Sequence, residues 1–426
     1  MDSTLRDQLN EIDWSFDSAD TQFSTHGISK YPARMIPQIP DTLLDLFQQH
    51  GYLSEDATVY DPFVGSGTTL ISAKMDGLNG IGNDINPYAV YLTKVKTTPI
   101  DASDLDACWY DIKTNILDNL GDISENEYTD ANLNDGWFPE PQLSQLLYIR
   151  EELDTLEEAY SEELIHPFRI ALATICRECS YQRNGEFKRY RMPEEKRTQH
   201  TPFVKDLYTT EVIEMMDTLK EFSDEYDNDA TITVQAEDSR KSSLQDDSID
   251  AVITSPPYGD HSTTVAYGQF SRDPAIIAFG ESKTQMLDVD KTGLGGRNSE
   301  ATIENLTQES EALDRTLTEL EKVEGGRTDD ALTFFTDFYL VMEDLYRVLK
   351  PGQPLVWVVA NRTMSRTPIP THIITTQLCE SLGFTHEQTL PRSIPSKTLP
   401  WENAPENETG NTGKLMADEN IIILTK

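Results

Sequence analysis

Short apolar runs bounded by turn residues alternate with amphipathic stretches toward both ends of the chain. The strand-like runs cover residues 57–63, 78–84, 230–238, 248–255, 354–362, a run from 383 onward and 420–426. The helix-like stretches, with apolar residues every three or four positions, cover residues 68–75, 332–350 and 371–382. This alternation predicts an α/β fold in which helices cover both faces of a mostly parallel sheet. We expect the last two strands to close the sheet as an antiparallel pair.

Two long stretches do not fit a minimal sheet of this kind. Residues 100–229 separate two predicted strands, where a simple crossover needs only a few tens of residues. Their pattern is mostly helical and acidic, so we expect an inserted helical subdomain. Residues 259–330 are polar and rich in Thr and Glu, and we expect a long, partly mobile loop region there. The α/β domain is then built from an N-terminal half, 1–99, and a C-terminal half, 230–426.

The chain is strongly acidic. Its 426 residues include 35 Lys and Arg against 74 Asp and Glu, which gives a formal net charge of −39. Such a charge would normally repel nucleic acid, yet a hydrophobic content of 37% is that of a folded protein. The even spread of acidic residues predicts a halophilic protein adapted to molar salt. At about 1 M salt the screening length is about 3 Å, so only local charged patches would decide what the protein binds.

The sequence predicts a cytoplasmic protein without a membrane segment. It has no apolar run near the roughly 18 residues that a membrane span needs. The start, MDSTLRDQLNEIDW, lacks the basic-then-apolar order of a signal peptide. The cysteines are too few for a disulfide scaffold, namely Cys108, Cys176, Cys179 and Cys379.

The first motif that carries chemistry is Asp61-Pro-Phe-Val-Gly65-Ser-Gly67-Thr68-Thr69. A strand that enters a Gly-x-Gly turn and a helix N-terminus lets the backbone approach a ligand closely. The motif lacks the Lys of a phosphate-binding loop and the third glycine of a dinucleotide fingerprint, which disfavours nucleoside triphosphates and NAD. A tight turn flanked by helix-capping acids would give the same pattern. Three converging strand ends favour a ligand site instead.

Two further acids follow strands of the same predicted sheet. Asp84 is placed to accept hydrogen bonds from two ribose hydroxyls, and Asp238 is placed beside an adenine edge. The combination suits an adenosine that carries a carboxylate-bearing tail better than it suits a pyrophosphate.

The second motif is Thr254-Ser255-Pro256-Pro257-Tyr258, directly after a strand. Two prolines hold an extended loop whose carbonyls have no ladder partner. Such a loop accepts hydrogen bonds from an exocyclic amino group while the following aromatic ring stacks on a flat base. The same residues could form a surface turn, but their position at a fourth strand end favours the catalytic interpretation.

At these residues the chain resembles the amino-group DNA methyltransferases of the cytosine-N4 type, which carry Ser-Pro-Pro-Tyr where adenine-N6 enzymes usually carry Asp-Pro-Pro-Tyr. The stretch 26–37, with Lys-Tyr-Pro-Ala-Arg, is similar to the family's element over the methionine end of the cofactor, and 255–272 and 391–405 also look like the family. The resemblance covers about half the chain, without a clear match for 100–170 or 275–330.

The resemblance implies a Rossmann-like fold that uses S-adenosyl-L-methionine, with the following cofactor residues: Tyr31, Pro32, Ala33, Asp61, Phe63, Gly65, Gly67, Thr68, Thr69, Asp84 and Asp238. It implies a catalytic loop formed by Ser255, Pro256, Pro257 and Tyr258 that receives a base flipped out of double-stranded DNA. The Ser255 hydroxyl and the Pro256 carbonyl would accept hydrogen bonds from the N4 amine, and the methyl would transfer in line. None of the four cysteines follows a proline, which argues against the nucleophile of cytosine-C5 enzymes.

One local patch opposes the overall charge. From Cys176 to Lys205 there are eight Lys and Arg against four Glu, which suggests contact with DNA phosphates. We expect substrate contacts from Arg183, Lys188, Arg189 and Arg191 in this patch, and from Tyr267, Gln269 and Arg272 after the catalytic loop. The alternative is that these basic residues only neutralise the charge of neighbouring acidic residues and do not contact DNA. Target recognition is assigned to 100–229 with help from 259–330.

Several alternatives stay open. The enzyme could instead methylate adenine N6 or an RNA base, or the chain could be a DNA-binding subunit without activity, although the intact motifs argue against decay. The pair Cys176 and Cys179 lacks two further zinc ligands, so two buried thiols on a helix are expected and no metal is assigned. Pairing with a restriction endonuclease is possible, and neither the recognised DNA sequence nor the oligomeric state can be deduced.

Overall fold

A seven-stranded sheet forms the centre of the structure, a computed structural model that describes residues 1–133, 136–183, 188–257, 266–297, 303, 305–394, 402–403, 413–414 and 418–426. Its strands follow the order β3-β2-β1-β4-β5-β11-β8. They are β1 (Thr58–Asp61), β2 (Asn79–Asn83), β3 (Ile232–Gln235), β4 (Ala251–Thr254), β5 (Pro354–Ala360), β8 (Thr385–Ser393) and β11 (Asp418–Thr425). The first five in this order run parallel, and β11 pairs antiparallel with β5 and β8. The α/β prediction and the antiparallel closing pair are confirmed.

Helices cover both faces of the sheet because successive residues of a strand point to opposite sides. In β5, Val356 and Val358 pack into one core, whereas Leu355 and Trp357 pack into the other. The first core is closed by α1 (Ser3–Glu11), α2 (Gln38–Gln49) and α3 (Thr68–Met75). The second core is closed by α12 (Leu306–Glu309), α13 (Glu311–Glu321), α14 (Thr328–Val348) and α15 (Thr371–Ser381).

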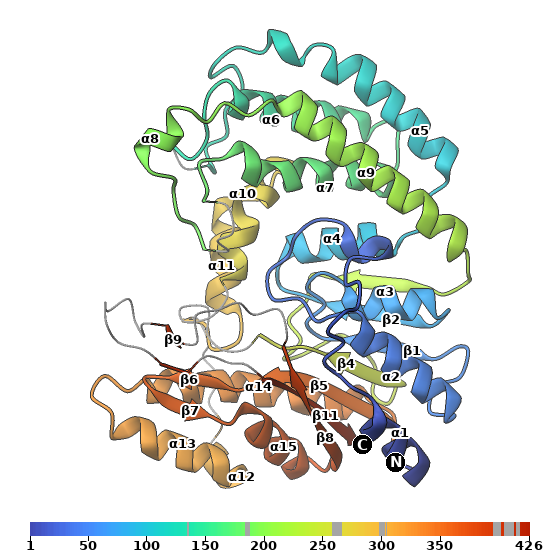
Figure 1. The fold of residues 1–426 in the computed structure, drawn as a ribbon, viewed down its shortest axis with the longest axis vertical. Helices are drawn as coiled ribbons and strands as arrows, with labels where there is room; N and C mark the ends of the chain where they lie inside the picture. The colour runs from blue at the N-terminus through green and yellow to red at the C-terminus, as the bar shows by residue number, and fades with distance from the viewer. Residues whose placement is uncertain are drawn as a thin grey trace.

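The predicted helical insertion between β2 and β3 is present. It consists of α5 (Ala102–Asp111), η2 (Ile112–Leu117), η3 (Leu120–Asp122), α6 (Gln142–Leu156), α7 (Glu162–Cys179), α8 (Glu194–Arg197) and α9 (Val204–Glu225). In Figure 1 these helices gather at one end of the molecule, beyond α4 (Pro87–Thr97). One apolar cluster runs from α4 through α5, α6, α7 and α9, so the insertion is fastened to the sheet through α4.

The expectation of a loop region at 259–330 is wrong for most of its described length. Residues of this region form α10 (Tyr267–Phe279), α11 (Lys283–Thr292), α12 and α13. Helix α10 packs against α7, and its carbonyls at Ile276 and Ala278 accept hydrogen bonds from Arg150 and Arg169 of the insertion. The helices were missed because their apolar residues face two different cores, so no single amphipathic pattern runs through the region.

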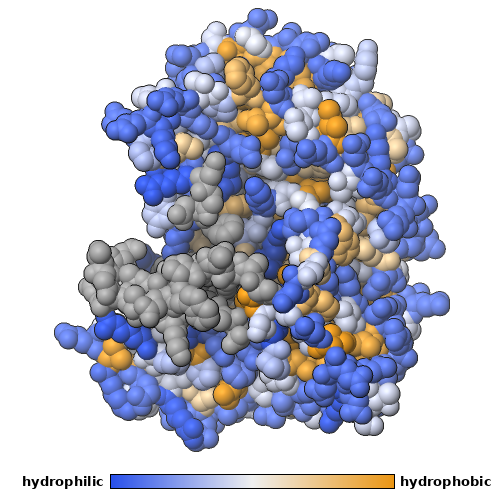
Figure 2. Space-filling model, in the orientation of Figure 1, coloured by the Kyte–Doolittle hydropathy of each residue, from blue (hydrophilic) through white to orange (hydrophobic). Residues whose placement is uncertain are grey.

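The remaining short elements are η1 (Ser24–Gly27), β6 (Arg362–Met364), β7 (Thr367–Ile369), β9 (Glu402–Asn403) and β10 (Gly413–Lys414). The face drawn in Figure 2 is mostly hydrophilic, with apolar residues scattered over it. Within the described residues, none of the helices combines the length and apolar character needed to traverse a bilayer.

Candidate cofactor and catalytic site

The carboxyl ends of the parallel strands meet at the point where the strand order reverses. Strand β1 lies between β2 and β4, and the chain leaves these strands toward opposite edges of the sheet. Open α/β sheets bind ligands in the crevice at such a point. A cavity lies there, and the predicted residues that line it are Tyr31, Ala33, Asp61, Phe63, Gly65, Thr68, Asp84, Asp238, Ser255, Pro257 and Tyr267.

Some predicted residues shape the cavity without lining it. Gly67 takes the left-handed conformation at φ +83°, and a Cβ there would come within 2.8 Å of Thr93 on α4. The Thr69 hydroxyl donates to the Ile253 carbonyl at 3.1 Å, which ties α3 to β4. Pro32 and Pro256 are buried beside the cavity. Tyr258 lies outside the described residues, as does most of the stretch 391–405.

Asp84 lies at the end of β2, where its carboxylate can accept hydrogen bonds from a ligand in the cavity. Its Oδ1 accepts from the Asn86 amide at 2.8 Å and its Oδ2 from the Gly65 amide at 3.0 Å. Each carboxylate oxygen has a second lone pair, so both can accept a further hydrogen bond from a ligand hydroxyl. Burial raises the pKa of Asp84 to about 6, against the lowering effect of those two amides.

Asp61 connects the glycine-rich turn to strand β4, which leads into the predicted catalytic loop. Its Oδ1 accepts from the Thr254 hydroxyl at 2.6 Å and from the Phe63 amide at 3.0 Å. Asp61 and Thr254 are both buried, and burial raises the pKa of Asp61 to about 6. Thr254 immediately precedes Ser255, so this bond fixes the start of the catalytic loop against the turn.

Aromatic rings form another wall. Tyr31 stacks on Tyr267 with ring centroids 5.8 Å apart, and its hydroxyl accepts from the Asn86 side-chain amide at 3.1 Å. The same amide donates to the Ser271 hydroxyl at 2.8 Å. Tyr267, predicted to contact the substrate, thus lies in the wall of the same cavity as Ser255, and its contact with the substrate stays a prediction. The ring packs there because α10 turns back onto the segment before α2.

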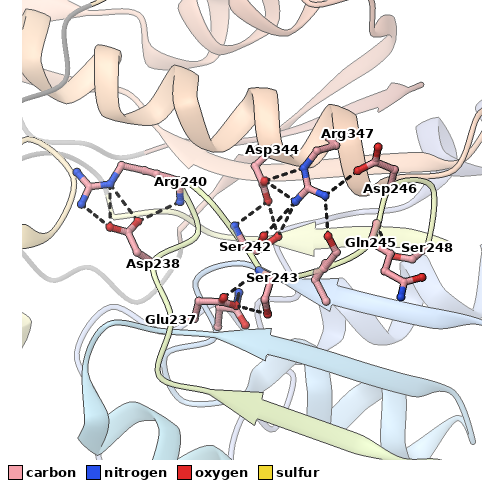
Figure 3. Close-up of polar contacts among 12 residues, drawn as sticks. Glu237, Asp238, Arg240, Ser242, Ser243, Gln245, Asp246, Ser248, Asp344 and Arg347 are labelled. Atoms are coloured by element: carbon pink, nitrogen blue, oxygen red, sulfur yellow. Dashed lines mark hydrogen bonds and ion pairs between the residues drawn. The ribbon is translucent and has the colours of Figure 1, made fainter.

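Sequence reasoning missed many residues of the cavity: Arg34, Met35, Pro62, Val64, Ser66, Ile85, Asn86, Glu237, Ser239, Arg240, Val289, Asp290, Thr292, Gly293, Leu294 and Val341. Several of these flank a predicted motif and could have been included on that ground. Residues 289–294 carried no signal, because they come from the region interpreted as a loop. Figure 3 shows how Asp238 meets Arg240 and how Glu237 meets Ser243 in the loop after β3.

Residues 181–183 and 188–192 of the basic segment pair antiparallel as a hairpin beside α10. Arg183 donates its amide to the Tyr190 carbonyl at 2.8 Å, and Gln182 bridges to Arg191. Arg183 and Arg191 are exposed, whereas the side chain of Arg189 is only 8% exposed. The Arg189 guanidinium pairs with Asp273 of α10 at 2.8 Å and lies 4.1 Å from the centre of the Trp137 ring. The predicted phosphate contact of Arg189 is therefore wrong in this conformation, since the hairpin uses that charge to dock on α10.

The other predicted substrate residues lie near the same docking site. The side chain of Gln269 accepts from the Arg189 amide at 3.4 Å, and Arg272 is half-buried on the same helix. Lys188 is partly buried on the returning strand of the hairpin, and its carbonyl accepts from the Gln182 side chain at 2.6 Å. These residues sit outside the cavity lining.

Cys176 and Cys179 are buried thiols on α7, as expected from their spacing. Burial raises the pKa of the Cys179 thiol to about 12 and also holds the pKa of the Cys176 thiol well above its usual range. Among the described residues, no cluster of three or more His, Cys, Asp or Glu side chains is arranged to hold a metal ion.

The comparisons with known proteins agree with this geometry. A family model described as D12 class N6 adenine-specific DNA methyltransferase matches residues 38–294. The Type II methyltransferase M.MvaI of Kocuria varians is 34% identical over 96% of this chain and 92% of its own length. The Type II methyltransferase M.BsoBI of Geobacillus stearothermophilus is 24% identical over 85% of this chain and 79% of its own.

A solved SAM-dependent methyltransferase from Methanosarcina mazei aligns over 89% of this chain and 96% of its own length, with 10% identity and a TM-score of 0.31. That score is too low to inform the function. The family match spans residues 38–294, which is more than half of the chain, and the first relative aligns with nearly the whole chain. The chain therefore belongs to the D12 class family of DNA methyltransferases and is a site-specific Type II enzyme that uses S-adenosylmethionine.

Proposed function

We propose that this enzyme transfers a methyl group to the exocyclic N4 amine of cytosine in duplex DNA. The observation that carries the proposal is Ser255, a neutral hydroxyl residue that lines the cavity directly after β4. The matching family model is named for adenine N6, so the identity of the target base rests on this residue and not on family membership.

The hydroxyl of the preceding residue, Thr254, already makes a hydrogen bond within the protein. Thr254 donates to Asp61, whereas Ser255 is only partly buried and lies on the cavity wall with Pro257. Ser255 is therefore the hydroxyl of this loop that is positioned for a substrate. Its Oγ and the carbonyl of Pro256 would accept the two N4–H groups of cytosine. Because the amine lone pair is delocalised into the ring, these hydrogen bonds favour its localisation as the nitrogen becomes tetrahedral.

The cofactor supplies an activated methyl group on a sulfonium. The residues present fit it, because Asp84 retains a lone pair on each carboxylate oxygen for the ribose hydroxyls and Asp238 borders the same cavity. Tyr31 and Phe63 offer apolar surface to the rest of the adenosine. The chain's own contribution is then positioning of both reactants, without a covalent intermediate.

DNA would approach along the hairpin formed by residues 181–183 and 188–192. Arg183 and Arg191 are exposed there, in a chain whose overall charge repels phosphates. The hairpin docks on α10 through Arg189 and Asp273, and α10 also contributes Tyr267 to the cavity. We therefore place target recognition in the 100–229 insertion, next to the catalytic loop.

The test is incubation with methyl-labelled S-adenosylmethionine and mixed duplex DNA in concentrated potassium chloride, followed by nucleoside digestion and mass spectrometry. Label in N4-methylcytosine is the expected result. Label in N6-methyladenine would overturn the assignment from Ser255 while keeping the enzyme class. A Ser255→Asp variant sharpens the test, because an acid in this position would resemble the adenine-type motif and should weaken cytosine methylation.

A further inference from the structure

Two arginines fasten the loop between β3 and β4 to helix α14. Arg240 lies on the loop and reaches Asp337 of the helix, with Nη1 and Oδ1 2.9 Å apart. Arg347 lies on the helix and reaches back to Asp246 of the loop at 2.9 Å, while it also pairs with Asp344. Asp337 and Asp344 are seven residues apart, so they lie on one face of α14. Figure 3 shows Arg240 on the loop and Arg347 reaching the same loop from the helix.

Only Arg240 of these two borders the cofactor cavity. It holds Asp238 by four hydrogen bonds. The Arg240 backbone amide and Nε donate to Oδ1 at 3.0 Å each, Nε also donates to Oδ2 at 3.0 Å, and Nη2 donates to Oδ2 at 2.5 Å. A planar guanidinium that meets a carboxylate in this way fixes its rotation as well as its position. Only three N–H groups make these contacts, because both oxygens share Nε, so about one of the roughly four acceptor sites of the carboxylate remains for a ligand. The Asp238 side chain is 46% exposed, which leaves that site accessible.

The same guanidinium holds the opposite wall of the cavity. Its Nη2 donates to the Thr292 carbonyl at the end of α11, at 2.9 Å. Its partner Asp337 is fully buried and accepts from the Gly295 amide at 2.8 Å. Thr292, Gly293 and Leu294 line the cavity between these two bonds. Asp238 and the end of α11 are therefore held at a fixed separation by one side chain.

We propose that Arg240 is the positioning residue that gives the enzyme its preference for the adenine base of its cofactor. This proposal rests on the proposed placement of Asp238 beside the adenine edge of the cofactor. Arg240 then aims the Asp238 carboxylate at the exocyclic amino group of that adenine. Hypoxanthine, which carries a carbonyl oxygen in place of that amino group, would meet the fixed carboxylate acceptor to acceptor. A site built to hydrogen-bond one group rejects an analogue that lacks it, provided that the site cannot turn away.

The experiment compares two ligands on the full chain without DNA. Binding of S-adenosylhomocysteine and S-inosylhomocysteine is measured by titration calorimetry in concentrated potassium chloride. The wild-type protein is expected to prefer the adenosyl ligand by about tenfold or more. In Arg240→Gln this preference should fall toward equal affinity, because Asp238 is free to rotate. Arg240→Lys keeps the charge without the planar fork and should give an intermediate preference.

Arg347→Gln is the matched control. It also removes an arginine between the loop and α14, but Arg347 does not border the cavity, so the ligand preference should stay at the wild-type ratio. Equal weakening of both ligands in the Arg240 variants, with the preference intact, would mean that Arg240 serves the fold alone and would overturn the proposal. A wild-type protein that binds both ligands equally would overturn it as well. Neither outcome depends on which DNA base is methylated, so the cytosine assignment is tested separately.

Discussion

The hydroxyl of Thr254 donates a 2.6 Å hydrogen bond to Oδ1 of Asp61 in the buried centre of the sheet. The bond joins the last residue of β4 to the last residue of β1, two strands that pair in parallel. Because Phe63 donates its amide to the same oxygen, the glycine-rich turn and the catalytic loop share one anchoring atom.

Thr254→Val should uncouple the two loops with little change in volume. The Asp61 carboxylate would lose its strongest donor in a buried place, which costs about 1–3 kcal/mol of stability. We expect a lower melting temperature and a lower turnover number, since Ser255 is no longer held against the turn. Thr254→Ser retains the hydroxyl and is the control. If both variants turned over at the wild-type rate, the bond would have no role in positioning Ser255.

Ser255→Ala should lower turnover by about a hundredfold or more, the typical effect of removing one hydrogen-bond partner of a transition state. Cofactor affinity should change little, because Asp84 and Asp238 remain. The measurement is single-turnover methylation of duplex DNA together with a cofactor titration. Ser248→Ala, in the loop before β4 with its hydroxyl bound to the Gln245 carbonyl, is the control. Unchanged turnover in Ser255→Ala would remove this residue from the catalytic site.

Cofactor affinity should decrease as the pH falls through about 6. Burial raises the pKa of Asp84 to about 6, and ribose hydroxyls that donate to it favour the ionised form. Below this pH the ligand must displace a proton, which weakens binding by up to about tenfold per pH unit. Asp61 titrates near the same pH, so the contrast between wild type and Asp84→Asn identifies the group. The variant should bind weakly at all pH values and lose this dependence.

The stability of the ligand-free protein should depend on pH through Asp84 in the opposite direction from cofactor affinity. Its folded-state pKa of about 6 lies above the ordinary value of 3.8 for an aspartate, so between about pH 4 and 6 the folded state binds more protons than the unfolded state. The contribution of Asp84 to the free energy of unfolding therefore increases as the pH falls from 7 toward 4. Thermal unfolding of wild type and Asp84→Asn, compared across this range, measures it. A wild-type advantage that grew with rising pH would contradict the assignment.

The arginines of the basic hairpin should fall into two groups, those that bind DNA and those that stabilise the fold. The double change Arg183→Gln and Arg191→Gln should raise the Michaelis constant for DNA and reduce its salt dependence, with little effect on melting. Arg189→Gln should instead lower the melting temperature, because it leaves Asp273 buried without its partner, a loss of about 3–5 kcal/mol. If Arg189→Gln affected only DNA binding, the docking role of this residue would be wrong.

The sequence was sufficient to predict those parts of the site that are formed by residues close together in the chain. Gly65, Gly67 and Asp84 could be predicted because turns, helix starts and strand ends leave short-range patterns. The α/β class and the antiparallel closing pair followed from the same strand patterns. Arg34 and Asn86 adjoin these motifs and could have been included by extending each motif a few residues.

Residues that depend on long-range packing could not be predicted in this way. Tyr267 was predicted as a substrate contact, but its stacking on Tyr31, more than two hundred positions earlier in the chain, depends on how α10 packs on the insertion and carried no signal in the sequence. Arg189 looked like a DNA contact, because composition counts a positive charge without showing the buried Asp273 that holds it. Arg240 takes its role from Thr292 and Asp337, neither of which belongs to a motif.

Strand β11 lies between β5 and β8, although it follows both of them in the sequence and is synthesised after them. Until residue 425 has been made, β5 is an exposed edge whose partner does not yet exist. Translation at about 5–20 residues per second leaves this edge unpaired for several seconds. Such an edge can pair with another nascent chain. The nascent protein is therefore most vulnerable to aggregation in the interval between synthesis of β5 and synthesis of β11, and a chain truncated before residue 418 would keep that hazard permanently.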